Sequence, residues 1–323
     1  MTLIKIPPAW QLSENQITPE AVFLNRRQFL RGAIATGLAA STLPLAACNN
    51  DSTSTLNSQT AYKNLIRNPS FTDVGRPITA ESLTSTYNNF YEFGTGKSIW
   101  QAAQALPLEN WKVEVTGLVK NPRTYDLDQL NKKFAIEERI YRFRCVEAWA
   151  MVVPWVGFPM SLLVQDVEPT SEAKFVRFTS FYDPQITKGG SLLGARPWPY
   201  TESLRLDEMM NDLAFFATGV HGKPLPKQNG APLRMVTPWK YGFKGAKSIV
   251  KIEFLATQPA TFWNTINANE YDVEANVNPS KPHPRWSQAT ERIVSDAPSL
   301  LWETRPTLPY NGYGEYVAKL YAS

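Results

Sequence analysis

The amino-acid sequence predicts an α+β fold in which mixed β-sheets, short helices and long loops form one domain. Segments that alternate between apolar and polar residues, as half-buried strands do, dominate the chain after residue 61. The chain also has 25 prolines, 10 tryptophans, 13 tyrosines and 16 phenylalanines, a composition that suits a rigid, loop-rich enzyme and not a helical bundle or a disordered protein. Residues 61–323 contain no linker-like stretch and no repeat of fixed period, so we expect a single domain there.

The individual elements follow from the periodicity of apolar residues. Strand-like alternation occurs at residues 111–117, 140–145, 175–181, 233–236 and 250–254. Helical spacing occurs at residues 126–133, 205–216 and 287–294, and Ser203 is a candidate cap for the second of these segments. Proline and glycine interrupt the chain at short intervals, which keeps the expected helices short.

Residues 1–47 have the features of a twin-arginine signal peptide. The sequence Asn-Arg-Arg-Gln-Phe-Leu-Arg at 25–31 is a twin-arginine motif, and a weakly apolar run of small residues follows it. This run is shorter than the ~20 apolar residues that span a bilayer. Twin-arginine export carries folded proteins, so the motif predicts a periplasmic protein that the twin-arginine export machinery delivers after any cofactor has been inserted.

Residues 48–60 are rich in Ser, Thr and Asn and are predicted to form a flexible leader. The Leu-Ala-Ala-Cys that ends at Cys48 resembles a lipoprotein cleavage box, in which Cys48 would be lipidated and would tether the protein to a membrane. Ordinary cleavage nearby is the alternative, and both remain open. In either case Cys48 is a poor disulfide partner, which leaves Cys145 unpaired in an oxidising compartment.

Cys145 is the only cysteine of the predicted domain. The alternation at 140–145 places Tyr141, Phe143 and Cys145 on one face of a strand, with Arg142 and Arg144 on the other. The sulfur is therefore expected to point inward. The residues alone allow two interpretations, a buried cysteine that acts as a small hydrophobic side chain and a metal ligand or nucleophile.

Several function classes are excluded by what the sequence lacks. The formal charge is +4 without a basic run, so no nucleic-acid partner is expected. The chain has none of the motifs GxGxxG, GxxxxGK[ST], GxSxG and HExxH. Its two histidines, His221 and His283, lie beside glycine and proline and are expected to be structural. A metal at Cys145 would thus need an organic cofactor that brings its own sulfur ligands.

Four separated blocks of sequence are recognisable together. They are YNNFYEF at 87–93, EERIYRFRCVEAW at 137–149 with MVVPWVGFP after it, QNGAPLRMVTPWKYGFKGAKSI at 228–249 and NPSKPHPRWSQATERI at 278–293. In this order they resemble the catalytic subunits of bacterial periplasmic protein-methionine-sulfoxide reductases, which are sulfite-oxidase-like molybdenum enzymes. The resemblance covers the chain from about residue 61 to residue 321. It implies a sulfite-oxidase-like fold for the domain, with one Mo-molybdopterin per chain.

The resemblance also assigns roles to residues. Cys145 matches the thiolate that ligates molybdenum, and Arg234 suits a phosphate because its planar fork gives paired, charge-assisted hydrogen bonds. The segment 245–247 matches a phosphate cradle of main-chain N–H groups with an ammonium. Ser180 falls where the family has a hydroxyl side chain. The full implied cofactor-binding set is Asn88, Tyr91, Glu92, Cys145, Ser180, Asn229, Arg234, Gly245, Ala246 and Lys247.

By the same resemblance the enzyme reduces methionine sulfoxide residues in oxidised periplasmic proteins. The resemblance also implies that electrons come from a membrane haem-binding subunit that oxidises quinol, and this chain itself has no CxxCH motif for haem. The aromatic candidates for lining the substrate pocket are Trp149, Trp155, Trp198 and Trp239. Two other functions remain open: a molybdenum enzyme of the same fold that acts on sulfite or a small S- or N-oxide, and a cofactor-free surface lipoprotein in which Cys145 is part of the core.

Overall fold

The structure is a computed structural model that describes residue 62, residues 64–189 and residues 196–322. The predicted signal peptide at 1–47 and the predicted leader at 48–60 lie outside the described residues. The described residues all belong to one compact unit, 57–323. Within them, no helix is long and apolar enough to cross a membrane.

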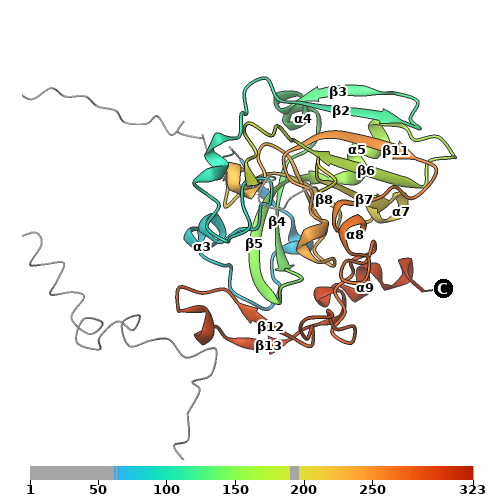
Figure 1. Cartoon of the computed structure of the whole chain (residues 1–323). Coiled ribbons are helices and arrows are strands. Elements are labelled where there is room, and N and C mark those ends of the chain that lie inside the picture. The colour runs from blue at the N-terminus through green and yellow to red at the C-terminus, as the bar shows by residue number, and fades with distance from the viewer. Residues whose placement is uncertain (1–61, 63, 190–195, 323) are drawn as a thin grey trace, which may run out of the picture. The chain divides into compact units, whose positions relative to one another are not determined.

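Two β-sheets form the framework of this unit (Figure 1). The first sheet has the order β1-β4-β5-β12-β13, and β8 pairs with β5 and carries β9 and β10. The second sheet has the order β3-β2-β11-β6-β7. Both sheets mix parallel and antiparallel pairs, since β12 runs parallel to β5 and β2 runs parallel to β11. The α+β class with mixed sheets is therefore confirmed.

Most of the predicted strands begin and end within one or two residues of the observed strands. The first sheet contains β1 (Ile66–Arg67), β4 (Glu137–Arg144), β5 (Trp149–Pro159), β8 (Phe215–Val220), β9 (Lys223–Pro224), β10 (Arg234–Val236), β12 (Thr290–Ile293) and β13 (Thr304–Pro306). The second contains β2 (Lys112–Gly117), β3 (Arg123–Asp126), β6 (Phe175–Ser180), β7 (Thr201–Arg205) and β11 (Ile249–Leu255). All five predicted strands are confirmed.

The helices are short, as the density of proline and glycine predicts. The α-helices are α3 (Glu81–Thr86), α4 (Leu127–Lys133), α5 (Met160–Val167), α7 (Leu206–Met209), α8 (Phe262–Ile266) and α9 (Gly314–Val317). Seven 3₁₀ turns join them among the described residues: η2 (Pro69–Phe71), η3 (Ala102–Ala105), η4 (Lys227–Asn229), η5 (Gly242–Lys244), η6 (Ser299–Leu301), η7 (Pro309–Gly312) and η8 (Ala318–Leu320). The predicted helix at 126–133 is confirmed, and it begins with a capping box in which Asp126 Oδ1 accepts from the Gln129 N–H at 2.7 Å.

Two helix predictions need correction. The segment 205–216 is helical only at Leu206–Met209, because Phe215 and Phe216 begin β8 and are fully buried between strands. The segment 287–294 is not a helix but contains strand β12, which pairs with β5 on one side and β13 on the other. In both segments, sheet partners distant in sequence outweigh the local helical spacing of apolar residues.

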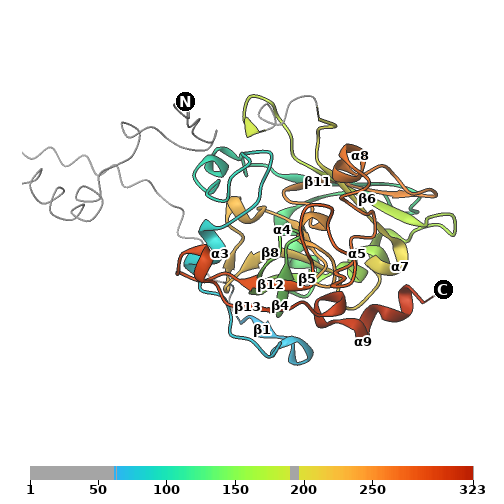
Figure 2. The same ribbon diagram turned by 60° about the horizontal axis from the view of Figure 1, so that its bottom comes forward.

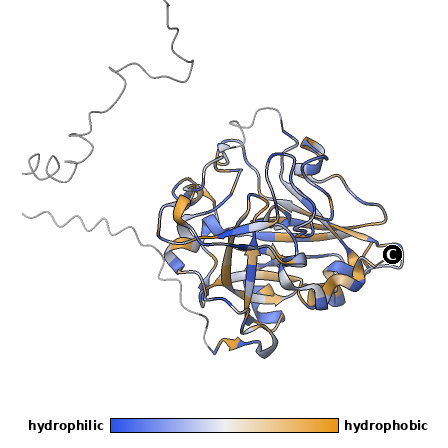
Figure 3. Cartoon of the chain, turned by 90° about the horizontal axis from the view of Figure 1, so that it is seen from below, coloured by the Kyte–Doolittle hydropathy of each residue, from blue (hydrophilic) through white to orange (hydrophobic). Residues whose placement is uncertain are grey.

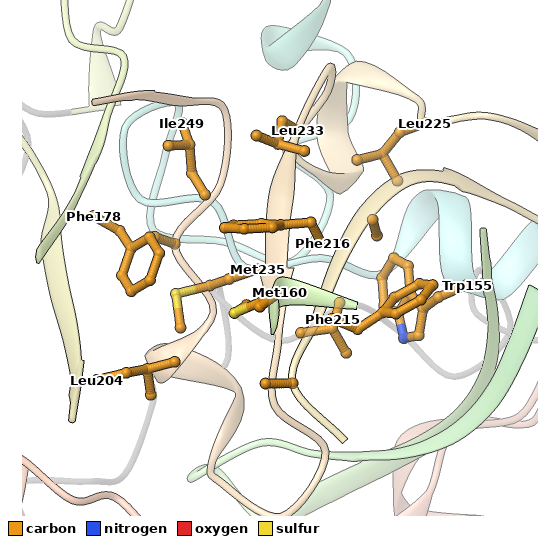
Figure 4. Close-up of a cluster of buried hydrophobic side chains, with 14 of the residues drawn as sticks. Trp155, Met160, Phe178, Leu204, Phe215, Phe216, Leu225, Leu233, Met235 and Ile249 are labelled. Atoms are coloured by element: carbon orange, nitrogen blue, oxygen red, sulfur yellow. The ribbon is translucent and has the colours of Figure 1, made fainter. Parts of the chain in front are cut away.

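The main hydrophobic core lies between the two sheets (Figure 4). Phe178 of β6 meets Phe216 of β8 edge to face, with ring centroids 6.1 Å apart, so one contact joins both sheets. Met160, Leu204 and Ile249 are also inaccessible to solvent or nearly so. Burying each such side chain contributes about 1.5–3 kcal/mol. Figure 3 shows the hydrophobic residues concentrated on the central strands, with hydrophilic residues along the surrounding loops.

Strand β5 explains the apolar run that follows Cys145. It lies between β4, β12 and β8, and its residues are buried along almost its whole length. A strand covered on both faces needs no polar alternation. The register Arg144↔Ala150 closes the β4–β5 hairpin over the turn at 145–149.

The C-terminal segment fixes this turn from outside (Figure 2). Arg144 lies on the opposite face from Cys145, as predicted, yet it is fully buried because residues 288–307 cover it. Its guanidinium donates to Gln288 Oε1 at 2.8 Å and to Thr307 Oγ1 at 3.2 Å. The carbonyl of Val146 accepts from Gln288 Nε2 at 2.7 Å. Strand β12 is thereby held directly beside the cysteine turn.

Candidate active site

A cavity of about 830 Å³ opens beside the turn that joins β4 to β5. Four segments that are far apart in sequence line it: the loop after α3, the cysteine turn, the loop before β10 and the loop between β10 and β11. The side facing the C-terminal part of the chain adds Trp263, Tyr271, Arg285, Trp286 and Arg292. The β4–β5 hairpin thus brings Cys145 to a cavity that several loops line together.

Cys145 is the first residue after β4 and is held by the turn itself. Its N–H donates to the Trp149 carbonyl at 2.9 Å, and the Ala148 N–H donates to the Cys145 carbonyl at 3.0 Å. The residue is only 4% exposed, and Sγ accepts from Asn89 Nδ2 at 3.6 Å and from the Glu147 N–H at 3.5 Å. Burial, with the nearby Glu147 carboxylate, raises the pKa of the Cys145 thiol to about 12. A cation bound at the sulfur would be needed to keep a thiolate there.

A group of polar side chains stands next to this sulfur. Glu147 forms an ion pair with Lys97, and it accepts from Tyr91 Oη at 3.1 Å and from Trp149 Nε1 at 3.2 Å. Burial alone would raise the pKa of Glu147, but the hydrogen bond and charge of Lys97 outweigh it, so the pKa lies below its usual value. Burial, reinforced by Glu147, raises the pKa of Tyr91. Beside the sulfur the site therefore holds a carboxylate that is paired with Lys97 and a phenol that keeps its proton.

Two amide side chains are fixed against one carbonyl. Asn88 Nδ2 and Asn229 Nδ2 donate to the carbonyl of Thr84 at 2.9 and 3.0 Å. Thr84 Oγ1 lies 3.0 Å from His221 Nε2, which steadies the end of α3. Both amide oxygens, Asn88 Oδ1 and Asn229 Oδ1, are buried without a hydrogen-bond partner. Buried acceptors are rarely left unpaired, so they indicate a ligand that brings N–H donors to this wall.

Arg234 and Lys247 bring positive charge to the same cavity. Arg234 is buried, and its guanidinium donates only to the carbonyls of Asn229 at 3.0 Å and Met235 at 3.4 Å, so it meets no carboxylate among the described residues. Burial lowers the pKa of Arg234 to about 10. Burial also lowers the pKa of Lys247, and the positive charge of Arg234 lowers it further. Burial raises the pKa of Glu92. Two cations that share one cavity in this way indicate a site for an anionic group such as a phosphate.

The cavity therefore fits an elongated ligand with N–H donors, an anionic group and a metal that accepts a sulfur ligand. Within the part of the chain that the structure describes, no three His, Cys, Asp or Glu side chains come together to hold a metal ion. A metal at Cys145 would thus need further ligands from an organic cofactor. A molybdopterin has these features: N–H groups on its pterin, two dithiolene sulfurs and a phosphate.

Most of the predicted cofactor residues meet at this cavity. The predicted residues that line it are Asn88, Tyr91, Glu92, Cys145, Asn229, Arg234, Gly245 and Lys247. Ser180 lies outside its lining at the end of β6, where its buried Oγ has no partner. Ala246 is buried and also lies outside the lining.

The phosphate cradle at 245–247 stays a prediction. The N–H of Gly245 donates to Gly242 at 3.2 Å, and the N–H of Ala246 donates to Lys244 at 3.1 Å. These two donors complete the η5 turn. The side chains of Arg234 and Lys247 bring positive charge to the same part of the cavity, and Gly245 keeps space for Arg234, because a Cβ there would lie 2.9 Å from its Nη2.

The predicted aromatic lining is correct in part. Trp149 and Trp155 line the cavity, whereas Trp198 and Trp239 do not. Trp239 is fully buried and donates to Tyr321 Oη at 2.9 Å, and Trp198 stacks on Tyr182 with ring centroids 5.1 Å apart.

Four lining or supporting residues had no role assigned from the sequence: Asn89, Lys97, Glu147 and Arg292. Two of them carried a signal, because Asn89 lies inside the YNNFYEF block and Glu147 follows Cys145 by two positions. Lys97 had none. It reaches the site only because the loop after α3 folds back, with a bridge between Asn88 and Ser98.

Comparisons with known proteins agree with this site. The family model described as an oxidoreductase molybdopterin binding domain matches residues 101–263. The chain is 48% identical over 316 residues to the protein-methionine-sulfoxide reductase catalytic subunit MsrP of Burkholderia mallei, covering 96% of this chain and 93% of that protein. It is 46% identical over 332 residues to the protein of the same name from Pseudomonas syringae pv. tomato, covering 99% and 97%. The crystal structure of the sulfane dehydrogenase SoxCD from Paracoccus pantotrophus covers 47% of this chain and 40% of its own, with 18% identity and a TM-score of 0.40, too little to support an argument.

Proposed function

Because the chain belongs to the family of protein-methionine-sulfoxide reductase catalytic subunits, we propose that it is a molybdenum-dependent enzyme that reduces methionine sulfoxide residues in proteins. The single observation that carries this proposal is the position of Cys145. Its sulfur faces a cavity of about 830 Å³ whose walls carry two unpaired amide oxygens and two cationic side chains, Arg234 and Lys247. Near-full-length identity of 46–48% to proteins named for this activity supports the substrate class.

One Mo-molybdopterin per chain would be held by residues that line this cavity. Cys145 would ligate molybdenum, Asn88 Oδ1 and Asn229 Oδ1 would accept from the pterin, and Arg234 with Lys247 would hold the phosphate. Tyr91 and Glu92 would complete the pterin wall. When bound, this cofactor supplies two-electron oxygen-atom transfer, so that a sulfoxide, two electrons and two protons give a thioether and water.

The contribution of the chain itself is to position the sulfoxide and to hold protons. Tyr91 Oη donates to Glu147 Oε1 at 3.1 Å, while Lys97 pairs with Oε2 of the same carboxylate. Two proton donors therefore border one acceptor beside Cys145. Asn89 Nδ2, near the sulfur, is placed to donate a hydrogen bond to a sulfoxide oxygen.

The decisive test joins metal analysis with activity. Protein exported from a host that makes the cofactor should contain about one molybdenum per chain and reduce oxidised protein with a reduced dye as electron source. Oxidation of sulfite, or reduction of a small S- or N-oxide, with no action on oxidised protein, would instead support another reaction of the same fold. A preparation without molybdenum would support the cofactor-free surface lipoprotein.

We also propose that the protein is delivered to the periplasm by the twin-arginine machinery and receives electrons from a membrane haem-binding, quinol-oxidising subunit. The motif at 25–31 supports the export route, and the word "subunit" in the names of the relatives supports a partner. Replacing Arg26 and Arg27 by Lys should leave the protein in the cytoplasm, and normal export of that variant would refute the route. Labelling with a radioactive fatty acid would show whether Cys48 is lipidated, and Cys48→Ser is the control.

A further inference from the structure

The β12–β13 hairpin joins the cavity wall to an exposed apolar tip. Leu300 and Leu301, in the 3₁₀ turn Ser299–Leu301, are 94% and 73% exposed, the highest fractions among the exposed large hydrophobic side chains that the structure describes. Exposed leucines are common singly, but two adjacent ones at a loop tip indicate a contact surface. We name this surface, formed by Arg292, Leu300, Leu301 and Trp302, the hairpin surface.

The hairpin surface is continuous with the cavity. Arg292 of β12 pairs in register with Trp149 of β5 and lines the cavity. Trp302 lies below the tip and packs against Tyr87 with ring centroids 5.3 Å apart, and Tyr87 packs against Trp149 at 5.2 Å. Both Tyr87 and Trp149 line the cavity. Figures 1 and 2 show β12 and β13 beside β5.

The tip is held firmly enough to present its leucines. Trp302 Nε1 donates to the carbonyls of Ser295 at 3.1 Å and Ala297 at 2.9 Å, which closes the loop around the indole. Trp302 is only 8% exposed, so the loop has its own buried anchor. The leucines are therefore exposed because the fold places them outward, and not because the loop lacks an anchor.

Charge indicates what would bind there. The Arg292 guanidinium lies over the Trp302 ring at 5.8 Å and has no ion pair with any described residue. Arg285, on the same side of the cavity, is paired with Glu270 at 2.7 Å. An unpaired guanidinium between the cavity and an apolar tip favours an occupant with a carboxylate followed by an apolar side chain.

We propose, on the basis of the proposed function, that the hairpin surface binds the oxidised protein substrate as an extended segment with an acidic residue and an apolar residue near the methionine sulfoxide. Trp302, which anchors the tip, contacts Tyr87 and through it Trp149 of the cavity wall, with ring centroids 5.3 and 5.2 Å apart, and an extended chain advances about 3.3 Å per residue. The residue that contacts the leucines therefore lies a few positions from the sulfoxide. The carboxylate contacts Arg292 between them.

The first test compares a double variant, Leu300→Ser with Leu301→Ser, with the control Ile66→Ser. Ile66 is 70% exposed, but it pairs with Glu137 at the start of β4, whereas Cys145 follows the last residue of that strand. With a reduced dye as electron source, the double variant should raise KM for oxidised β-casein about tenfold at unchanged kcat. Its kinetics on free methionine sulfoxide, and all kinetics of Ile66→Ser, should match the wild type.

The second test addresses charge. Oxidised peptides with Asp two positions from the methionine sulfoxide should have a lower KM than matched peptides with Lys there, and Arg292→Gln should abolish the difference. Equal KM values in the wild type would overturn the role of Arg292.

Other outcomes separate the remaining explanations. A double variant with wild-type kinetics on oxidised β-casein overturns the proposal. If that variant instead loses only quinol-driven turnover in membranes, the tip binds the electron donor, and if it loses only sedimentation with lipid vesicles, the tip binds the bilayer. A molybdenum-loaded wild type that reduces free methionine sulfoxide but not oxidised β-casein contradicts the proposed function itself.

Discussion

Lys97 Nζ donates to Asn89 Oδ1 at 2.5 Å, and this bond fixes which side of the Asn89 amide faces Cys145. Because the oxygen of Asn89 is occupied by an ammonium, its Nδ2 is turned to the sulfur, 3.6 Å away. Lys97 also pairs with Glu147. One residue without any sequence signal therefore orients the two polar side chains nearest the sulfur.

Replacing Lys97 by Met should release both side chains. A hydrogen bond to a charged group contributes about 1.5–3 kcal/mol, so kcat for oxidised protein should fall about 10- to 100-fold. Molybdenum content should stay near one per chain, while the Mo(V) paramagnetic signal should change because Asn89 and Glu147 move relative to the sulfur. Lys97→Arg, which keeps the charge, should recover part of the activity. Unchanged spectra and rates in Lys97→Met would contradict the orienting role.

Asn88 and Asn229 both donate to the carbonyl of Thr84, and this arrangement leads to a prediction on cofactor content. Asn229→Leu removes the acceptor proposed for the pterin and leaves the Thr84 carbonyl with one donor fewer. Losing a buried hydrogen bond costs about 1–3 kcal/mol, so purified protein should contain markedly less molybdenum. The exposed Asn269 provides the matched control, since Asn269→Leu should retain full content. Full loading of Asn229→Leu would exclude this contact.

Arg234 should affect the apoprotein and the holoprotein in opposite directions. Burial lowers its pKa from 12.5 to about 10, and at 1.36 kcal/mol per pKa unit the buried charge costs the apoprotein about 3 kcal/mol at neutral pH. Because the folded pKa is the lower one, this cost is present below about pH 10. Arg234→Met should therefore raise the free energy of unfolding of the apoprotein, measured with urea, and also reduce molybdenum content. A destabilised apoprotein would mean that Arg234 already has its partner within the chain.

Cys145→Ser should abolish turnover while leaving the fold intact. A hydroxyl is a poor substitute for a soft thiolate ligand, so the Mo(V) signal should be changed or absent. The substitution is nearly isosteric at a buried position, and the melting temperature of the apoprotein should stay within a few degrees of the wild type. Wild-type activity would refute the ligand role.

A buried ion pair away from the cavity should determine how the C-terminus is held. Lys240 Nζ lies 2.7 Å from Glu208 Oε1, and Tyr321 Oη donates to the same oxygen at 2.6 Å. Lys240→Met should lower the free energy of unfolding by about 3–5 kcal/mol, whereas Lys240→Met combined with Glu208→Leu should recover most of it. If the double variant is as unstable as the single one, the loss comes from packing and not from the unpaired charge.

The same pair predicts a pH dependence. Burial would raise the pKa of Glu208, but Lys240 and Tyr321 outweigh it, so the folded-state pKa is below its usual value. The stabilisation from Glu208 is then fully present above about pH 5 and is lost as the pH falls through the folded pKa. Urea unfolding of the apoprotein between pH 7 and pH 3 should show a smaller decline in Glu208→Gln than in the wild type.

The sequence predicts an element correctly where the residues of that element alone determine its secondary structure. Strands such as 175–180 and 249–255 alternate clearly, and Asp126 carries its own capping box, so their local pattern and their tertiary role agree. Strand β12 has a helical spacing of apolar residues, and only its pairing with β5 and β13 makes it a strand. Likewise, Arg144 alternates as predicted but is buried because a segment more than 140 positions away covers it.

The sequence by itself determined the α+β class, the single thiol at 145 of the domain and the blocks that carry the cofactor residues, because short-range periodicity and motif order are properties of the chain. Only the tertiary structure decided that Lys97 orients Asn89, that Arg234 and Lys247 share one cavity with Cys145, and that Leu300 and Leu301 are exposed at the tip of the β12–β13 hairpin. These relationships depend on which loops the two sheets bring together, and no local interaction along the chain specifies that.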